Sequence, residues 1–542
     1  MAEATRVATQ PIAGQKPGTS GLRAKTLVFM QPHYLENFVQ AAWAGLDGIA
    51  GKVLVLGGDG RFFNDRAAQV ILRMAAASGA ARVIVGRDGL LSTPAASHLI
   101  RKRGSDGGVL MSASHNPGGE DEDFGVKVNI ANGGPAPEVV TARIHAATQT
   151  IDHYLTLERP ELDLSRLGEQ RLGEMVVEVV DPVADYAELM EELFDFNAIR
   201  GLLASGFQLR FDAMHAITGP YATEILERRL GAAPGSVMNA TPLPDFGGGH
   251  PDPNPTWAKP LYDAVFAPGA PDFAAASDGD GDRNMILGRG IYVSPSDSLA
   301  VLAANAHLAP GYAQGLKGVA RSMPTSTAVD RVAAARGVPC YATPTGWKFF
   351  GNLLDAGRVT LCGEESFGTG SDHVREKDGL WAVLMWLNIL AATGKSVAEI
   401  LQDHWAEFGR TYYSRHDYEA LDTATAQALI DDLRARLPDL PGTEAGALTV
   451  TAAEDFAYTD PVDGSTSTGQ GLQISLADEA RAVLRLSGTG TEGATLRLYL
   501  ERYSADDLGR DPQEALAPVI EAVEALTGLS ARTGRTAPDV IT

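Results

Sequence analysis

Residues 52–86 read KVLVLGGDGRFFNDRAAQVILRMAAASGAARVIVG, and this stretch decides the class of fold. The apolar runs at 52–57 and 82–86 are typical of strands. Between them, a tight turn at 58–61 leads into a helical segment from about residue 66 to 77. Strands that alternate with helices in this order predict an α/β fold.

The length of the chain, 542 residues, exceeds what one hydrophobic core supports, so we expect several domains. Acidic residues outnumber basic ones, 68 to 45, and the formal net charge is -23. This balance argues against a nucleic-acid-binding protein, because binding the phosphate backbone requires a basic surface. An anionic substrate would therefore have to meet a local cluster of Lys and Arg.

The cysteine content and the hydropathy pattern bear on the cellular compartment. Cys340 and Cys362 are too few for a disulfide framework or a cysteine-based zinc site, which favours a reducing cytosol. The N-terminus has no long apolar segment. The most hydrophobic stretch, Leu380–Ala392, is shorter than a membrane span and is interrupted by Asn388, so we expect a buried helix there. The sequence predicts a cytoplasmic protein without a membrane partner.

Residues 107–119, GGVLMSASHNPGG, combine a short apolar strand with a polar turn that presents Ser114 and His115. Serine is a weak nucleophile unless a base, a cation or backbone donors activate it, and this turn offers such surroundings. Taken alone, Ser and Asn before Pro-Gly are more typical of an ordinary loop. Lys127 follows closely and is either a cation beside the turn or a solvated side chain.

Residues 274–283, AAASDGDGDR, contain three carboxylates at alternate positions, Asp278, Asp280 and Asp282. Separated by glycines, they can turn inward together around a hard divalent cation. An EF-hand loop would need Gly and Glu where Arg283 and Arg289 stand, which argues against calcium signalling. Three carboxylates leave coordination positions open, and this suits magnesium shared with a phosphoryl group. The alternative is a plain Asp/Gly turn, in which these like charges would repel one another.

Two loops in the next part of the chain offer groups for a polar ligand. Residues 343–348, TPTGWK, form a Pro/Gly-containing loop, and residues 363–368, GEESFG, follow a short strand. The carboxylates and hydroxyl of the second loop could hold sugar hydroxyls, although a helix-capping turn is an equal alternative. The charge-dense segment 371–378 has the composition of a solvated surface loop.

Residues 485–497, RLSGTGTEGATLR, lie among long alternating strands near the C-terminus. Glycines let backbone N–H groups converge, hydroxyls add donors, and two arginines can grip an anion bidentately, so the segment is a candidate phosphate cradle. It has neither the Lys of a Walker loop nor the spacing of a dinucleotide fingerprint.

These motifs, taken together and in this order, resemble the α-D-phosphohexomutase superfamily: SASHNP (112–117), DGDGDR (278–283), GEESFG (363–368) and RLSGTG (485–490). Four further segments resemble the phosphoglucomutase family within it: KPGTSGLR (16–23), TGWKFF (345–350), GSDHVREKDGLW (370–381) and RTGRTAP (532–538). The resemblance covers nearly the whole chain.

The resemblance implies an α/β fold of three similar mixed α/β domains and a smaller α+β C-terminal domain around a central cleft. The expected domains are 1–185 with the phosphoserine loop, 186–304 with the metal-binding loop, 305–406 with the sugar-binding loop, and 407–542 with the phosphate-binding segment. It further implies an isomerase, an intramolecular phosphotransferase that interconverts α-D-glucose 1-phosphate and glucose 6-phosphate.

The family's site residues fall on matching positions of this sequence. Ser114 would carry the phosphoryl group, with one Mg²⁺ per active site between it and Asp278, Asp280 and Asp282. Glucose 1,6-bisphosphate would be activator and intermediate. The remaining roles are a cationic set around the transferring group (Arg23, Lys127, Arg283, Lys377), sugar contacts (Thr345, Gly346, Glu364, Ser366) and a clamp for the passive phosphate (Arg485, Ser487, Gly488, Thr489, Arg497).

Some alternatives stay open at this point. The general base that accepts the sugar hydroxyl proton is His115 or Lys377. A related mutase would act on mannose or N-acetylglucosamine phosphates, and a catalytically silent relative would serve as a structural partner. The intact Ser114 and acid triplet argue against the silent relative. Sugar phosphates are the expected partners, with neither nucleic acid nor membrane.

Overall fold

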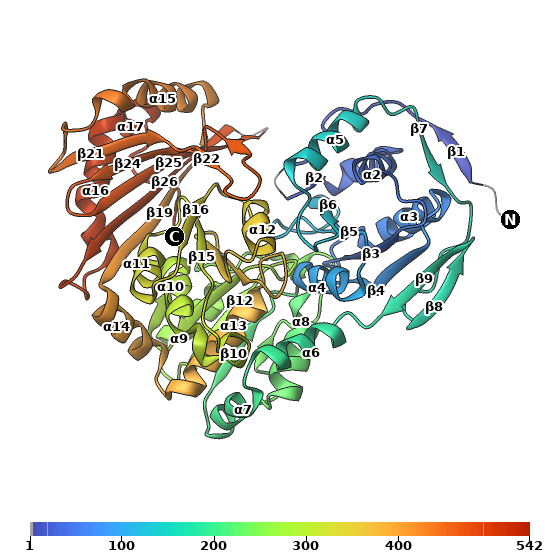
Figure 1. Cartoon of the computed structure of the whole chain (residues 1–542), viewed down its shortest axis with the longest axis horizontal. Helices are drawn as coiled ribbons and strands as arrows, with labels where there is room; N and C mark the ends of the chain where they lie inside the picture. The colour runs from blue at the N-terminus through green and yellow to red at the C-terminus, as the bar shows by residue number, and fades with distance from the viewer. Residues whose placement is uncertain (1–3, 19, 491–492) are drawn as a thin grey trace.

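The structure, a computed structural model, describes residues 4–18, 20–490 and 493–542, and the side chains of residues 488–490 lie outside this description. Figure 1 shows the N-terminal domain on the right and the C-terminal domain on the upper left, with the second and third domains between and below them. Strands alternate with helices in the first three domains, as predicted.

Within the described residues, the first domain is built on a seven-stranded sheet. In spatial order its strands are β2 (Leu22–Lys25), β6 (Asp123–Ile130), β5 (Gly107–Met111), β3 (Val53–Gly58), β4 (Arg82–Leu90), β9 (Met175–Val180) and β8 (Gly168–Leu172). The four strands from β5 to β9 are parallel and the outer pairs antiparallel. Helices α2 (Tyr34–Gly45) and α3 (Asn64–Ala77) belong to the hydrophobic core on one face, and α4 (Thr93–Arg103) to the core on the other.

The second and third domains carry smaller mixed sheets in the described part of the chain. The second has β11 (Val237–Met238), β10 (Leu209–Asp212), β12 (Phe273–Ser277), β13 (Asn284–Gly288) and β14 (Ile291–Val293). The third has β16 (Cys340–Thr343), β15 (Val319–Ser322), β17 (Leu361–Glu364) and β18 (Gly368–Ser371). Their α-helices are α6 (Ala184–Leu193), α7 (Phe196–Ala204), α8 (Thr218–Ala222), α9 (Lys259–Phe266), α10 (Pro295–Asn305), α11 (Ala328–Arg336), α12 (Lys348–Asp355), α13 (Gly379–Thr393) and α14 (Val397–Phe408).

The C-terminal domain is an antiparallel sheet covered by helices on one face. Its strands, in spatial order over the described residues, are β20 (Glu444–Ala445), β21 (Leu448–Asp455), β24 (Leu472–Leu476), β25 (Ala480–Gly490), β26 (Gly493–Ser504), β19 (Arg410–Leu421) and β27 (Val540–Ile541). Leu484 and Leu498 pack under α15 (Thr423–Arg436) and α16 (Pro512–Thr527). Val483 and Tyr499 point to the opposite face, where they contact Met323 of the third domain.

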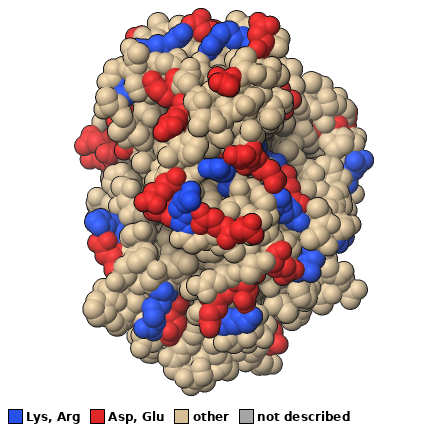
Figure 2. All heavy atoms as spheres, turned by 90° about the vertical axis from the view of Figure 1, so that its left-hand side faces the viewer, with Lys and Arg blue, Asp and Glu red and all other residues tan. Residues whose placement is uncertain are grey.

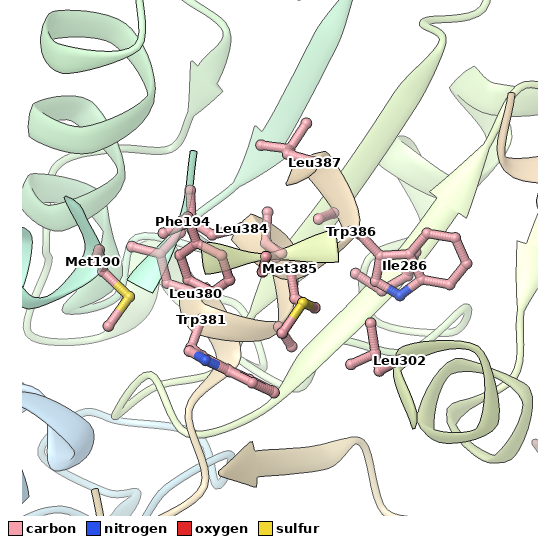
Figure 3. Close-up of a cluster of buried hydrophobic side chains, with 14 of the residues drawn as sticks. Met190, Phe194, Ile286, Leu302, Leu380, Trp381, Leu384, Met385, Trp386 and Leu387 are labelled. Atoms are coloured by element: carbon pink, nitrogen blue, oxygen red, sulfur yellow. The ribbon is translucent and has the colours of Figure 1, made fainter. Parts of the chain in front are cut away.

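Helix α13 lies at the centre of the largest core. All residues from Gly379 to Leu390 are buried, and an apolar helix without a polar face belongs in an interior. Figure 3 shows Trp381 and Trp386 on this helix between side chains of α6, β13 and α10. The buried helix predicted at 380–392 is therefore confirmed.

Two sequence expectations concern membranes and surface charge. Among the described residues, no single helix is long and apolar enough to cross a membrane, although the bent pair α13 and α14 passes that test by length and composition. Figure 2 shows Lys and Arg interspersed with Asp and Glu on the face that lies on the left of Figure 1. That face has no broad basic area of the kind that nucleic acid would require.

One expectation from composition is wrong. The charge-dense segment 371–378 is not a solvated surface loop, because Ser371, Glu376 and Asp378 are all buried. The segment fills the space between β18 and α13, and its charges face other charged side chains inside the protein.

Candidate active site

Ser114 lies in the turn after strand β5, with its side chain at the domain boundary. Its Oγ is 2.9 Å from Asp278 Oδ2 and 3.3 Å from His115 Nδ1. The residue is only 2 % exposed and has a φ of 53°, in the left-handed region that costs energy for a non-glycine residue. The turn therefore holds the hydroxyl against the acidic loop of the second domain.

A buried ion pair that the sequence analysis missed supports this turn. Arg61 Nη2 is 2.9 Å from Asp59 Oδ2, and both side chains are fully buried. Arg61 also donates to the carbonyl oxygens of Ser114 and Asp123, at 2.8 Å each. On the other side, a Cβ at Gly279 would lie 2.3 Å from the Ser114 carbonyl oxygen, so only glycine fits there. The predicted turn at 58–61 is thus part of the site.

The acid triplet occupies the loop between β12 and β13. One carboxylate oxygen from each of Asp278, Asp280 and Asp282 can be chosen so that all three lie within 4.8 Å of one another, and all three residues are buried. Asp278 Oδ1 accepts the backbone N–H groups of Asp282 and Arg283. Among the described residues, Oδ1 of Asp280 and Oδ1 of Asp282 accept no hydrogen bond. Buried carboxylate oxygens that accept no hydrogen bond indicate a site for a hard cation.

The carboxylates of the triplet repel one another. Burial and the charges of Asp282 and Asp280 raise the pKa of Asp278 well above its ordinary value. Burial alone would also raise the pKa of Asp280, but Lys127 and the hydroxyl of Thr93, 2.7 Å away, hold it well below that value. A bound cation would relieve the repulsion that Asp278 experiences.

Two lysines approach the triplet from different domains. Lys127 Nζ lies 3.5 Å from Asp280 Oδ2, 4.0 Å from Asp282 Oδ2 and 3.8 Å from Glu376 Oε1. Lys377 Nζ lies 3.2 Å from Asp282 Oδ1, an ion pair without hydrogen-bond geometry. Lys127 is buried, so the solvated alternative is wrong. Burial raises the pKa of Glu376 to about 7, and no sequence signal had singled this residue out.

Two arginines complete the cationic set. Arg283 Nη1 is 3.3 Å from Asp252 Oδ1. Burial lowers the pKa of Arg23, on strand β2. The negative charges of Asp280 and Asp282 raise this pKa, whereas the positive charges of Arg283 and Arg61 lower it further. Burial and the charges of Arg283 and Arg23 also hold the pKa of His115 well below its ordinary value, so its ring is neutral at pH 7.

The two predicted sugar loops meet in the third domain. Glu364, at the end of β17, accepts the backbone N–H of Gly346 at 2.8 Å, and burial raises its pKa. Thr345 Oγ1 accepts a hydrogen bond from Arg485 Nη1 at 2.6 Å. The sugar loops are therefore linked to the clamp segment of the C-terminal domain. Ser366 lines the cavity described below.

The clamp segment spans the hairpin of β25 and β26. Arg485 and Arg497 are paired in register across these strands, as are Ser487 and Thr495. Arg497 Nε lies 3.5 Å from Asp417 Oδ2 on β19, which faces Arg497 in the sheet. Gly488 and Thr489 belong to β25, but their side chains lie outside the described part of the structure.

A cavity of about 450 Å³ connects the reactive serine loop with the clamp. His115 and Asn116 line it from the first domain, Arg283 from the second, Ser366 from the third and Arg497 from the C-terminal domain. Ser114, the acid triplet, Lys377, Thr345 and Arg485 are not among its lining residues. The cavity also exposes residues that sequence reasoning missed: His250, Asp252, Trp257, Arg415, Asp417 and Glu419.

Comparisons with known proteins cover all four parts of the chain. Residues 14–155, 184–290 and 295–408 match alpha/beta/alpha domains I, II and III of phosphoglucomutase/phosphomannomutase. Residues 410–539 match the C-terminal domain of phosphoglucomutase-1.

Relatives and solved structures agree with these matches. The chain is 60 % identical over 538 residues to a phosphoglucomutase of Rhizobium radiobacter, covering 99 % of both chains. It is 50 % identical to a probable cytoplasmic phosphoglucomutase of Arabidopsis thaliana, again over 99 % of both. The open form of pp63/parafusin, a phosphoglucomutase from Paramecium, superposes with a TM-score of 0.93 at 47 % identity, covering 100 % of this chain and 99 % of that one.

The four motifs approach one another from four domains, each domain matches a family model, and the relatives align over the full length of the chain. The chain therefore belongs to the phosphoglucomutase family of the α-D-phosphohexomutase superfamily.

Proposed function

We propose that the chain interconverts α-D-glucose 1-phosphate and glucose 6-phosphate through phosphorylated Ser114 and a glucose 1,6-bisphosphate intermediate. The observation that carries this proposal is the 2.9 Å contact of Ser114 Oγ with Asp278, beside a cavity that extends from His115 to Arg497. An enzyme that exchanges two phosphates of one sugar needs a reactive site and a passive clamp. The two ends of this cavity supply candidates for both.

Each half-reaction is a phosphoryl transfer. The bond between phosphorus and Ser114 Oγ breaks, a bond from phosphorus to a free sugar hydroxyl oxygen forms, and the proton leaves that hydroxyl. After the bisphosphate has turned over, its other phosphate returns to Ser114 Oγ and the sugar oxygen takes up a proton. Arg23, Lys127, Arg283 and Lys377 would stabilise charge on the transferring oxygens.

Mg²⁺ fits the acid triplet. The donors are all carboxylate oxygens, they are buried, and Asp280 Oδ1 and Asp282 Oδ1 accept no hydrogen bond among the described residues. Asp278, Asp280 and Asp282 would hold one ion together with the phosphate on Ser114. When bound, the ion supplies positive charge to the phosphoryl oxygens.

The sugar loops and the clamp take the remaining roles in this proposal. Glu364 and Ser366 would hold sugar hydroxyls, and Thr345 and Gly346 would recognise the second orientation of the sugar. Arg485, Ser487, Gly488, Thr489 and Arg497 would grip the passive phosphate. Each of the proposed domains 1–185, 186–304, 305–406 and 407–542 contains one of the four motifs, which supports this division of labour.

Two side chains are candidates for the proton acceptor. His115 is neutral and lines the cavity, whereas Lys377 lies beside Asp282. The pH profiles of kcat for His115→Asn and Lys377→Arg in separate variants test the two candidates, because only the loss of the base removes its titration from the profile, and Arg keeps the positive charge at position 377.

The experiment that tests the function is intact-mass analysis with glucose 1,6-bisphosphate. We expect a gain of about 80 Da in the protein and none in Ser114→Ala, because the serine oxygen is the acceptor. Turnover of glucose 1-phosphate compared with mannose 1-phosphate then defines the substrate. An unchanged mass in wild-type protein that is active would remove the phosphoserine from the mechanism.

We also propose sugar phosphates as the only partners and a cytoplasmic location. Support for the location comes from relatives in Arabidopsis thaliana and Solanum tuberosum that are named cytoplasmic, although others are named chloroplastic. Fluorescent tagging of the chain in its own cell tests it.

A further inference from the structure

The loop between β18 and α13 carries two of the charged side chains at the site. Its ends are Ser371, the last residue of β18, and Asp378, the N-cap of α13. Glu376 Oε1 accepts a hydrogen bond from Asn129 Nδ2 at 2.9 Å, and Lys377 faces the acid triplet. The placement of both side chains depends on how this loop is held.

His373 joins the two ends of the loop. Its Nδ1 is 2.7 Å from Ser371 Oγ, and its Nε2 is 2.9 Å from Asp378 Oδ2. The ring stacks on Trp381 at a centroid distance of 5.4 Å. Asp378 Oδ1 accepts from the backbone N–H of Trp381 at 3.0 Å and from the hydroxyl of Tyr186 at 2.6 Å. The bridge therefore also fixes the first turn of α13.

The hydrogen bonds continue beyond Ser371 in a consistent direction. Trp381 Nε1 can only donate, and it donates to the hydroxyl of Tyr312 at 2.8 Å. Tyr312 lies 2.5 Å from Ser371 Oγ. We assign the protons so that Tyr312 donates to Ser371 and Ser371 to His373 Nδ1, which leaves Nε2–H to donate to Asp378. Both ring nitrogens are then satisfied inside the protein.

Ser371, His373 and Asp378 have the residue types of a hydrolytic triad, but their burial excludes that role. Ser371 and Asp378 are 0 % exposed, and the His373 side chain is 1 % exposed. None of the three lines the cavity between the serine loop and the clamp. A nucleophile must reach its substrate, so these side chains support structure instead.

The start of α13 is tied to the acidic loop as well. The backbone N–H of Gly379 donates to the Gly281 carbonyl at 3.1 Å. A Cβ at Gly379 would lie 2.0 Å from the carbonyl oxygen of Arg283, so the two backbones are in direct contact. Lys377 stands two residues before this contact and four after His373. The hydrogen bonds of His373 on one side and the backbone contact of Gly379 on the other therefore fix the position of the Lys377 ammonium group.

We infer that His373 is a positioning residue for phosphoryl transfer: it ties Ser371 to Asp378 and thereby holds Lys377 against the acid triplet. This inference rests on the proposed role of Lys377 at the transferring phosphoryl group. A misplacement of about 1 Å in a reacting centre can lower a rate by about 100-fold. Loss of the tie should therefore reduce kcat more than it reduces substrate binding.

Two substitutions test the two hydrogen bonds of the His373 ring separately. His373→Asn can keep the hydrogen bond to Ser371 and loses the one to Asp378, whereas His373→Gln can keep the hydrogen bond to Asp378 and loses the one to Ser371. For both variants we expect a 10- to 100-fold fall in kcat, with KM for glucose 1-phosphate within about threefold of wild type. Should a variant fail to fold, Ser371→Ala removes one partner with the smallest change in volume and is judged in the same way.

His404 provides a matched control, because it is a buried histidine on α14. His404→Gln should lower the thermal midpoint and leave kcat unchanged. If the His373 variants showed the same pattern, with a lower midpoint and wild-type kcat, His373 would be a purely structural residue and the inference would be overturned.

A double-mutant cycle with Lys377→Arg distinguishes this inference from the proposal on which it rests. If His373 acts through Lys377, the double variant loses little more than Lys377→Arg alone. Additive losses would show that His373 acts elsewhere and would overturn the inference. A Lys377→Met enzyme with wild-type kcat would instead refute the proposed role of Lys377, whatever the His373 variants do.

Discussion

Lys127→Met is the most revealing perturbation of the charge balance around the acid triplet. The ammonium group is buried within 4.0 Å of three carboxylates, those of Asp280, Asp282 and Glu376. Burial alone would lower its pKa, but these carboxylates raise it above the ordinary value. Because the folded pKa is raised, the stabilisation is fully present at pH 7 and would be lost only above the ordinary lysine range.

Removing the ammonium group leaves buried negative charge without compensation. Breaking a buried pair in this way costs about 3–5 kcal/mol. The pKa of Glu376 is already about 7, so this carboxyl can take up a proton in the variant, and we expect the lower end of that range. For a unit of 150–250 residues, a loss of about 3 kcal/mol lowers the thermal midpoint by roughly 6–12 °C.

Magnesium should reverse much of this loss, because it supplies the missing positive charge. A ligand at 100 times its Kd stabilises the folded state by about 2.7 kcal/mol. The assay is differential scanning fluorimetry of wild-type and variant protein in chelator and in saturating Mg²⁺. We expect the variant's deficit to be large in chelator and smaller in Mg²⁺.

Lys102→Met is the control, since Lys102 also belongs to the first domain but pairs at the surface with Asp185 and Glu188 of α6. Surface pairs contribute about 0–1 kcal/mol, so its midpoint should change little in either buffer. A Lys127→Met deficit below about 2 °C in chelator, or one that Mg²⁺ leaves unchanged, would refute the reasoning.

Three further outcomes are expected. Asp280→Asn should weaken Mg²⁺ binding in calorimetric titration, because one of three anionic ligands becomes neutral, and unchanged affinity would contradict the metal assignment. Arg497→Ala should lower kcat/KM about 10- to 100-fold and raise the release of inorganic phosphate and free bisphosphate per turnover; wild-type values of all three would refute the clamp. Burial lowers the pKa of His404 to about 4, so the unfolded state binds more protons between pH 6.5 and 4, and the free energy of unfolding should fall as the pH falls through this window. Urea unfolding of wild type and His404→Gln measures this slope, and equal slopes in the two proteins would contradict the cause.

Local sequence patterns predicted the elements of the fold well where apolar periodicity is strong. The strand, helix and strand expected at 52–86 are β3, α3 and β4, with boundaries that differ by a few residues. Apolar periodicity also predicts a helix over 325–336, but α11 begins only at Ala328. The carbonyl oxygens of Met323 and Thr325 accept hydrogen bonds from Arg481 of the C-terminal domain, a tertiary contact that no local pattern contains.

The site residues also divide into those that a local sequence pattern predicts and those that depend on tertiary contacts. The Ser114 turn and the acid triplet were recognisable because the functional residues of each motif lie close together in the sequence. The structure brings the two motifs into contact. Asp59, Thr93, Glu376 and Asp417 were missed because each is a single residue in an ordinary segment. Their importance comes from what faces them across domain boundaries or between strands, and spacing along the chain does not encode that.

The cavity of about 450 Å³ has walls that come from nearly the whole length of the chain, from His115 to Thr542, and this has a consequence for biosynthesis. The ribosome releases the serine turn and the acid triplet long before strands β25 and β26. A chain that ends at residue 410 would therefore lack Arg415, Asp417, Glu419 and Arg497 from the wall of the cavity. The cavity is complete only after the last strands of the C-terminal domain have been synthesised and folded.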